Sequence, residues 1–184
     1  MIPAPGVSGP HVMQVAFMVE DLESACRNWI RTTGIGPFLE VPHVVLEEYG
    51  YRGQPAAGLD FSVAIAQSGG VQVELVQQHC DSVSAYRDTI AKGQGGFHHL
   101  AVYTGDYEAA YAHYRRQGFV AAVDGTFGGF RFSYIDATPA IGCMIELIEE
   151  NRAQSEFFAR IAEAAQGWDG VTDPIRPGFP TPAS

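Results

Sequence analysis

An internal repeat constrains the fold of this chain more than any other feature of its sequence. An apolar, strand-like run near the N-terminus contains Gln14, and a similar run in the middle of the chain contains His99. In the first copy, Asp21 stands seven positions after Gln14 and opens a run with helical spacing that ends at a glycine. In the second copy, Asp106 stands at the same distance from His99 and opens a matching run. Because a repeat of this kind sets the architecture, we expect two copies of one strand-and-helix unit.

Each copy also closes on an apolar strand that carries a glutamate followed by a leucine. The glutamate is Glu74 in the first copy and Glu146 in the second. Burying a carboxylate is costly unless it is paired or bound to a metal. One such glutamate could be an edge residue that faces water. Two at equivalent positions, together with the equivalent pair Gln14 and His99, indicate one site to which both copies contribute.

The alternation of side chains along a strand supports this convergence. Alternate residues share a face, so Gln14 shares a face with Ala16, and His99 shares a face with Ala101. The same alternation predicts that His98 points the other way. We therefore expect His98 to be a packed histidine rather than a fifth ligand.

The side chains of Gln14, Glu74, His99 and Glu146 are of types that together suit a divalent metal ion. Two carboxylates, one imidazole and one amide oxygen suit a six-coordinate divalent ion such as Zn²⁺, Ni²⁺, Co²⁺ or Mn²⁺, with room for water or substrate. Closed structural zinc sites usually use cysteine, and none of the three cysteines stands at a ligand-equivalent position. An open ion of this kind polarises a substrate carbonyl, and a neighbouring glutamate can then remove an α-proton.

With these motifs the chain resembles the vicinal oxygen chelate superfamily, the glyoxalase/bleomycin resistance/dioxygenase group, over roughly residues 12–149. The segment 96–101, Gly-Phe-His-His-Leu-Ala, is similar to the signature of methylmalonyl-CoA epimerase. The resemblance implies an α+β fold in which two tandem βαβββ modules form a curved mixed sheet around a metal site. The metal ligands that it implies are Gln14, Glu74, His99 and Glu146. Many members have histidine in place of Gln14, whereas human-type glyoxalase I uses Gln, Glu, His and Glu in this order.

The resemblance also implies a reaction. Glyoxalase I and the epimerases act through an enolate or enediolate, so we expect a metal-dependent lyase, isomerase or epimerase. The implied substrate is a small carbonyl compound, a hemithioacetal or an acyl-CoA thioester. Glu146 is the expected catalytic base and Glu74 the second catalytic carboxylate. No cluster of basic residues marks a site for CoA phosphates or for glutathione.

Two other functions stay open at this point. Resistance-type members of the superfamily are binding proteins that sequester a ligand and need no base, although the four ligand-type residues speak against this function. An extradiol dioxygenase needs iron held by two histidines and a carboxylate. Gln14 stands in place of one of those histidines, which disfavours the dioxygenase.

The rest of the chain divides around the two modules. We predict the first module at residues 11–79, a helical linker at 80–94 and the second module at 95–149. Residues 1–10 are predicted to be a flexible arm, and residues 150–184 a helix with a proline-rich, extended tail. This last helix could cap the sheet or contact a second subunit of a homodimer.

A polar, aromatic and glycine-rich segment at residues 47–55 interrupts the first module. Such a segment is either a long hairpin loop or a loop that covers the substrate, since long connections tend to be functional. Arg52 is its only cation. We therefore predict Arg52 to be the contact for an anionic group of the substrate.

Charge and cysteine content limit the partners and the compartment. The formal net charge of −10 argues against nucleic acid and anionic membranes as partners. No apolar run approaches the roughly 20 residues of a membrane span, and the N-terminus lacks the features of a signal peptide. Three widely spaced cysteines fit reduced thiols better than a disulfide framework. We expect a cytoplasmic protein whose partner is a small molecule.

Overall fold

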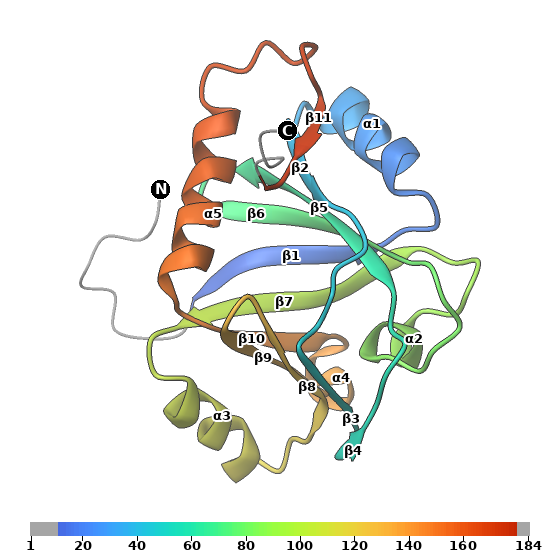
Figure 1. Ribbon diagram of the computed structural model, residues 1–184, viewed down its shortest axis with the longest axis vertical. Coiled ribbons are helices and arrows are strands. Elements are labelled where there is room, and N and C mark those ends of the chain that lie inside the picture. The colour runs from blue at the N-terminus through green and yellow to red at the C-terminus, as the bar shows by residue number, and fades with distance from the viewer. Residues whose placement is uncertain (1–10, 180–184) are drawn as a thin grey trace.

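The computed structural model describes residues 11–179, which form a single large sheet flanked by helices (Figure 1). The strands are β1 (Val12–Met18), β2 (Phe38–Val41), β3 (Glu48–Tyr51), β4 (Gln54–Pro55), β5 (Phe61–Ser68), β6 (Val71–Gln78), β7 (Gly96–Thr104), β8 (Ala121–Phe127), β9 (Phe130–Ile135), β10 (Met144–Glu149) and β11 (Ile175–Pro177). The helices are α1 (Leu22–Thr33), α2 (Ala85–Thr89), α3 (Tyr107–Arg116), α4 (Thr138–Ile141) and α5 (Arg152–Ala165). The predicted arm at residues 1–10 lies outside the described residues. No described helix has the length and apolarity needed to cross a membrane.

The strand order reproduces the repeat. It runs β11-β2-β5-β6-β1-β7-β10-β9-β8-β3-β4. β1 and β7, the first strands of the two copies, pair antiparallel at the centre of the sheet. Each also pairs in parallel with the last strand of its own copy, β6 or β10. The α+β fold with a curved mixed sheet is thereby confirmed.

The two helices of the repeat begin at the aspartates that the sequence singles out. Asp21 accepts a hydrogen bond from the Ser24 amide at 2.7 Å, and Asp106 accepts one from the Ala109 amide at 3.0 Å. These N-caps satisfy amides that a helix leaves free in its first turn. Gly34 ends α1 with φ of 74°, a conformation that costs glycine little.

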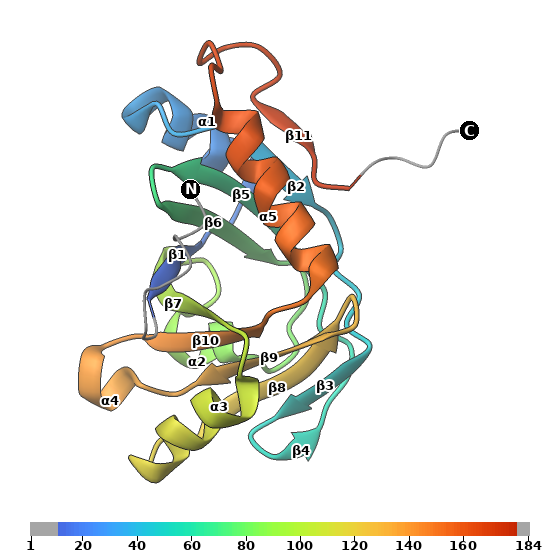
Figure 2. The same cartoon turned by 90° about the vertical axis from the view of Figure 1, so that its left-hand side faces the viewer.

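The helices cover different faces of the curved sheet (Figure 2). α1 packs on the first half of the sheet and α3 on the second half, each over a separate apolar cluster. α5 lies on the other face, where Phe157, Phe158 and Ile161 join the largest cluster. The helix predicted within residues 150–184 therefore caps the sheet. Its contact with a second subunit stays a prediction.

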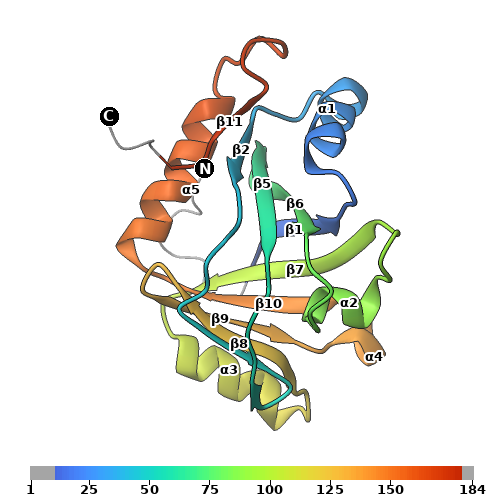
Figure 3. The ribbon, with the colours of Figure 1, turned by 45° about the vertical axis from the view of Figure 1, so that its right-hand side comes forward.

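The segment at residues 47–55 forms the hairpin β3–β4 and crosses to the second half of the molecule (Figure 3). β3 pairs antiparallel with β8, the outer strand of the second copy, with Gly50 opposite Asp124. A sheet edge leaves backbone donors and acceptors unpaired, and this hairpin covers that edge. The segment therefore ties the two halves together as a hairpin, which is the first of the two predicted alternatives.

The C-terminal segment lies along the opposite edge of the sheet. β11 pairs in parallel with β2, and the Gly178 amide then donates to the Glu40 carbonyl oxygen. A Cβ at Gly178 would lie 2.8 Å from that oxygen, so only glycine permits this close approach. Phe179, which follows, stacks on Phe157 of α5 with ring centroids 5.0 Å apart. Phe179 thus anchors the segment to α5.

Candidate metal centre

The four predicted ligands stand on the four central strands of the sheet: Glu74 on β6, Gln14 on β1, His99 on β7 and Glu146 on β10. Ala16 of β1 lies opposite both Glu74 and His99 in the strand register. Ala101 of β7 holds the equivalent position in the second copy, opposite Gln14 and a glutamate. Both alanines are completely buried. Their small side chains leave space in which the longer ligand side chains meet.

A β-bulge precedes each of the two equivalent ligands on β1 and β7. On β7, His98 is an extra residue without a partner on β1, directly before His99. On β1, Met13 is the extra residue, directly before Gln14. A bulge bends the strand and re-aims its side chains. The His98 ring therefore lies beside the His99 ring, where simple alternation predicted the opposite face.

The hydrogen bonds of His98 fix the tautomer of His99. His98 is 1% exposed, which confirms that it is a packed histidine. Burial lowers the pKa of His98 to about 3, so its ring is neutral. Its Nε2–H donates to the Ala85 carbonyl oxygen at 2.9 Å. Its Nδ1 must then accept from His99 Nδ1–H at 2.8 Å, which directs His99 Nε2 toward the two glutamates.

His99 Nε2 lies between two carboxylates with no hydrogen-bond partner among the described residues. It is 3.3 Å from Glu74 Oε2 and 3.2 Å from Glu146 Oε2, yet it forms a hydrogen bond with neither oxygen. One ligand atom from each of the three residues fits within 4.8 Å. A buried nitrogen without a partner is rare. A cation between these three atoms would satisfy all of them.

The electrostatics of the three residues also call for positive charge. Burial lowers the pKa of His99, but the nearby Glu146 and Glu74 carboxylates outweigh it and raise the pKa to about 9. Burial raises the pKa of Glu74 above its usual range. Two carboxylates in so little solvent are stabilised only by protons or by a metal ion.

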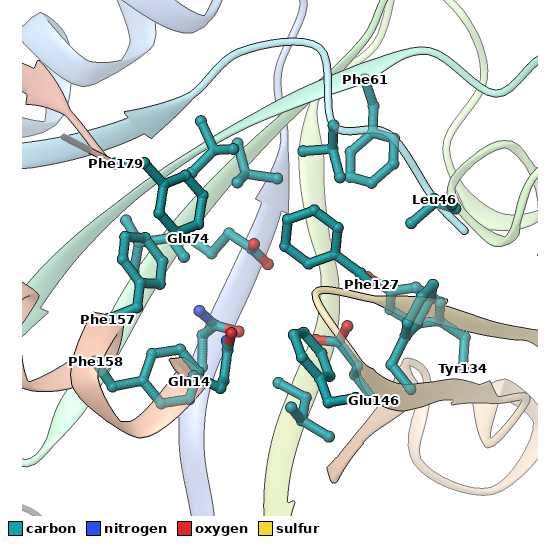
Figure 4. A pocket seen from close by; sticks show the side chains of 18 of the residues that line it. Gln14, Leu46, Phe61, Glu74, Phe127, Tyr134, Glu146, Phe157, Phe158 and Phe179 are labelled. Atoms are coloured by element: carbon teal, nitrogen blue, oxygen red, sulfur yellow. The ribbon is translucent and has the colours of Figure 1, made fainter. Parts of the chain in front are cut away.

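Gln14 is oriented by a second glutamine. Gln14 Nε2 donates to Gln72 Oε1 at 3.3 Å, and both side chains are buried. This bond leaves Gln14 Oε1 free to act as a ligand. Figure 4 shows the side chains of Gln14, Glu74 and Glu146 reaching into one cavity between aromatic rings. The chain therefore offers one nitrogen and three oxygen-bearing side chains of the types that divalent ions accept.

The cavity is small and is lined by two tyrosines that sequence reasoning missed. Its volume is about 80 Å³. Tyr86 and Tyr134 line it, with their hydroxyl oxygens 3.1 Å apart. Burial raises the pKa of both well above the ordinary value, so both stay protonated. Only one hydrogen can lie between the two oxygens, so the other hydroxyl hydrogen is available to a substrate oxygen.

Strand alternation contained a signal for part of this lining. Phe130, Phe132 and Tyr134 alternate along β9, and all three line the cavity. Tyr134 lies directly opposite Glu146 in the register between β9 and β10. Tyr86 sits on the short helix α2, and nothing in its local sequence indicates that it would face the site.

The structure does not bring Arg52 to the cavity. Its guanidinium donates to Asp88 at 2.7 Å and to Asp136 at 3.1 Å. Arg52 is not among the described residues that line the cavity, and neither is any other part of the β3–β4 hairpin. Its role as a substrate contact therefore finds no support in this geometry.

A second group of metal-ligand side chains lies at the surface. His43 Nδ1 is 2.7 Å from Asp60 Oδ1, and these atoms lie close to the His79 ring. His79 Nε2 is also hydrogen-bonded to Ser62 Oγ. The group is exposed, and its hydrogen bonds already explain its positions. Only the buried group has a nitrogen without a partner.

The family of the chain follows from a comparison with known proteins. The sequence model of the Glyoxalase/Bleomycin resistance protein/Dioxygenase superfamily matches residues 13–134, which include three of the four predicted ligands but not Glu146. No curated protein matches the sequence.

Similar solved structures agree on the fold. A hypothetical protein from Bacillus halodurans has 16% identity and a TM-score of 0.57, with 79% of this chain and 97% of that chain covered. A methylmalonyl-CoA epimerase in complex with methylmalonyl-CoA and NH4+ has 18% identity and a TM-score of 0.52, with 78% and 96% covered. The methylmalonyl-CoA epimerase from Mycobacterium tuberculosis has 19% identity and a TM-score of 0.51, with 85% and 97% covered. At such low identities these structures share the fold alone. By the match over most of its length, the chain belongs to the glyoxalase/bleomycin resistance protein/dioxygenase superfamily.

Proposed function

We propose that this protein is a divalent-metal-dependent enzyme that moves a proton at the carbon next to a substrate carbonyl. Isomerisation, epimerisation and lyase chemistry through an enolate all begin with this step. The observation that carries the proposal is the buried Nε2 atom of His99, which has no hydrogen-bond partner among the described residues and lies within 3.3 Å of two carboxylates.

The donor set fits a divalent ion. The groups that would hold it are Gln14 Oε1, the Glu74 and Glu146 carboxylates and His99 Nε2. Their mixture of oxygen and nitrogen suits Zn²⁺, Ni²⁺, Co²⁺ or Mn²⁺. A bound ion of this kind would supply Lewis-acid stabilisation of the negative charge that develops on the carbonyl oxygen.

The two glutamates divide the proton chemistry in this proposal. Glu146 is the base that takes the α-proton, because it stands beside the cavity and directly opposite Tyr134. Glu74, the other carboxylate beside His99 Nε2 at the cavity, is placed to return a proton. The free hydroxyl hydrogen of the Tyr86–Tyr134 pair can donate to a polar group of the substrate.

Solvent exchange tests this proposal without knowledge of the natural substrate. Metal-loaded protein in D₂O is incubated with hydroxyacetone, acetophenone or propionyl-CoA, each of which carries α-hydrogens. We expect deuterium to appear at the α-carbon of at least one compound, detected by NMR or mass spectrometry. Glu146→Gln keeps an oxygen ligand but loses the base, so exchange should fall by about 10²-fold or more while metal stays bound.

A matched control uses a nearby carboxylate. Glu150 is exposed and stands just beyond the end of β10, so Glu150→Gln should exchange at the wild-type rate. Full exchange in Glu146→Gln with its metal retained would rule out Glu146 as the base. Stoichiometric binding of a compound without exchange or turnover would instead favour a ligand-sequestering protein of the resistance type, a class that the superfamily's description also names.

A further inference from the structure

The cavity beside the candidate metal centre is walled by phenylalanine. Seven of the eleven phenylalanines in the chain line it. Phe127 and Phe130, at the β8–β9 turn, meet edge to face with ring centroids 5.7 Å apart. Phe157 and Phe179 face them from the other side (Figure 4). Such rings contribute large apolar area at fixed positions.

Charge at the cavity has one sign only. Among the described residues that line it, the charged side chains are Glu74 and Glu146, and no arginine or lysine is included. Carrier groups such as CoA phosphates or glutathione carboxylates are bound by cations in the usual case. Two arginines elsewhere are already engaged: Arg131 with Glu149, and Arg52 with two aspartates. An anionic group on the substrate would find no cationic side chain among these lining residues, and the two glutamates would repel it.

Three of the seven phenylalanines that line the cavity come from segments beyond the family match. The match ends at residue 134, whereas Phe157 and Phe158 are on α5 and Phe179 follows β11. Phe179 is held in place by the pairing of β11 with β2 and by the close approach of Gly178 to β2. These residues lie outside the part of the chain that the family model matches, and they line the cavity in which a substrate would lie.

We propose that the substrate is an uncharged carbonyl compound with a compact aromatic or branched hydrocarbon group. We further propose that Phe157 and Phe179 form the wall that recognises this group. The inference rests on the proposed function for the position of the reacting carbonyl, beside Glu146. The cavity volume of about 80 Å³ limits the group to a small one, since pockets for drug-sized ligands are several times larger.

Binding to metal-free protein tests the wall separately from the chemistry. The probes are acetophenone, acetone and propionyl-CoA, and the readout is the change in NMR shifts of the Val63 and Ile65 methyl groups, which line the cavity. We expect acetophenone to bind about tenfold or more tightly than acetone, because its phenyl ring leaves water for an apolar wall. Propionyl-CoA should bind more weakly than acetophenone.

Variants identify the wall. Phe179→Ala should weaken acetophenone binding by about fivefold or more, through lost ring contacts, and leave acetone binding unchanged. Phe179 is 45% exposed, so this variant should fold. Phe157→Ala should act in the same direction. Phe119→Ala is the matched control, because Phe119 packs against Tyr114 in the cluster under α3, away from the cavity.

Tighter binding of propionyl-CoA than of acetophenone would overturn the proposed substrate class. Binding of neither aromatic nor acyl probe at the cavity would also overturn it. Unchanged acetophenone affinity in both phenylalanine variants would overturn the assignment of the wall. Because the probes are tested without metal, none of these outcomes depends on whether the chain is a metal enzyme. Failure of the proposed function would appear instead as absent metal or absent α-exchange.

Discussion

Replacing His98 with alanine should weaken metal binding although His98 is not a ligand. His98 Nδ1 accepts the hydrogen bond that His99 Nδ1–H donates, and both rings are almost completely buried. Without this acceptor, the buried N–H of His99 loses its partner, which costs about 1–3 kcal/mol. The other tautomer, with the proton on Nε2, then becomes competitive. Partners of this kind typically contribute about 10–100-fold in metal affinity, and the two magnitudes agree because about 1.4 kcal/mol is tenfold.

Two further variants separate the hydrogen bond from the loss of packing. The amide oxygen of His98→Asn can take the place of Nδ1 and accept from His99. The longer amide of His98→Gln reaches the place of Nε2 and can restore only the bond to the Ala85 carbonyl. Both variants leave comparable space beside Tyr86 and Tyr134. We therefore expect His98→Asn to retain most of the metal affinity and His98→Gln to resemble His98→Ala.

The assay is competition between the protein and a coloured chelator for Zn²⁺ or Co²⁺, with the melting temperature recorded for each variant. ¹⁵N chemical shifts of the His99 ring report its tautomer directly. Wild-type metal affinity in His98→Ala would refute the reasoning. Equal affinities in the asparagine and glutamine variants would show that packing alone, and not the hydrogen bond, explains the effect.

Three further predictions concern the site and its surroundings. Metal affinity should fall about tenfold per pH unit below about pH 9, because a metal ion must displace the proton that His99 holds with a pKa of about 9. A metal affinity that stays constant from about pH 6 to pH 9 would contradict this prediction. Arg52→Ala should lower the melting temperature by about 2–4 °C, since the ion pairs of Arg52 contribute about 1 kcal/mol. The same variant should leave the Michaelis constant unchanged. A raised Michaelis constant at constant stability would instead support the predicted contact between Arg52 and the substrate. Ala16→Leu should abolish metal binding in calorimetry by filling the space between the ligands, whereas His43→Ala at the surface should not alter it.

The repeat made much of the fold and the site predictable from the sequence. Equivalent positions in two copies placed all four ligand-type residues, and two aspartates marked the helix starts. These signals are local and recur at fixed spacings, so they can be recognised without knowledge of the tertiary structure. The side on which His98 lies was not predictable, because a bulge depends on the register between β1 and β7 and interrupts the alternation.

Features that depend on distant partners were also beyond the sequence. Arg52 is an isolated cation in its own segment, yet the fold brings Asp88 and Asp136 to it from far along the chain. The apolar face of α5 predicted that the helix packs on the sheet. It did not show that Phe157, with Phe179, would wall the cavity, because that depends on where β11 joins the sheet edge.

The most direct measurement is anomalous diffraction from crystals of the metal-loaded protein. We predict one strong peak among the four central strands. Its ligands should be Gln14 Oε1, one oxygen each of Glu74 and Glu146, and His99 Nε2, at about 2.0–2.2 Å for zinc. His98 should lie outside the coordination sphere and hold its hydrogen bond to His99. A peak only at the surface group around His43, or an ion bound by His98, would contradict the assignment of this site.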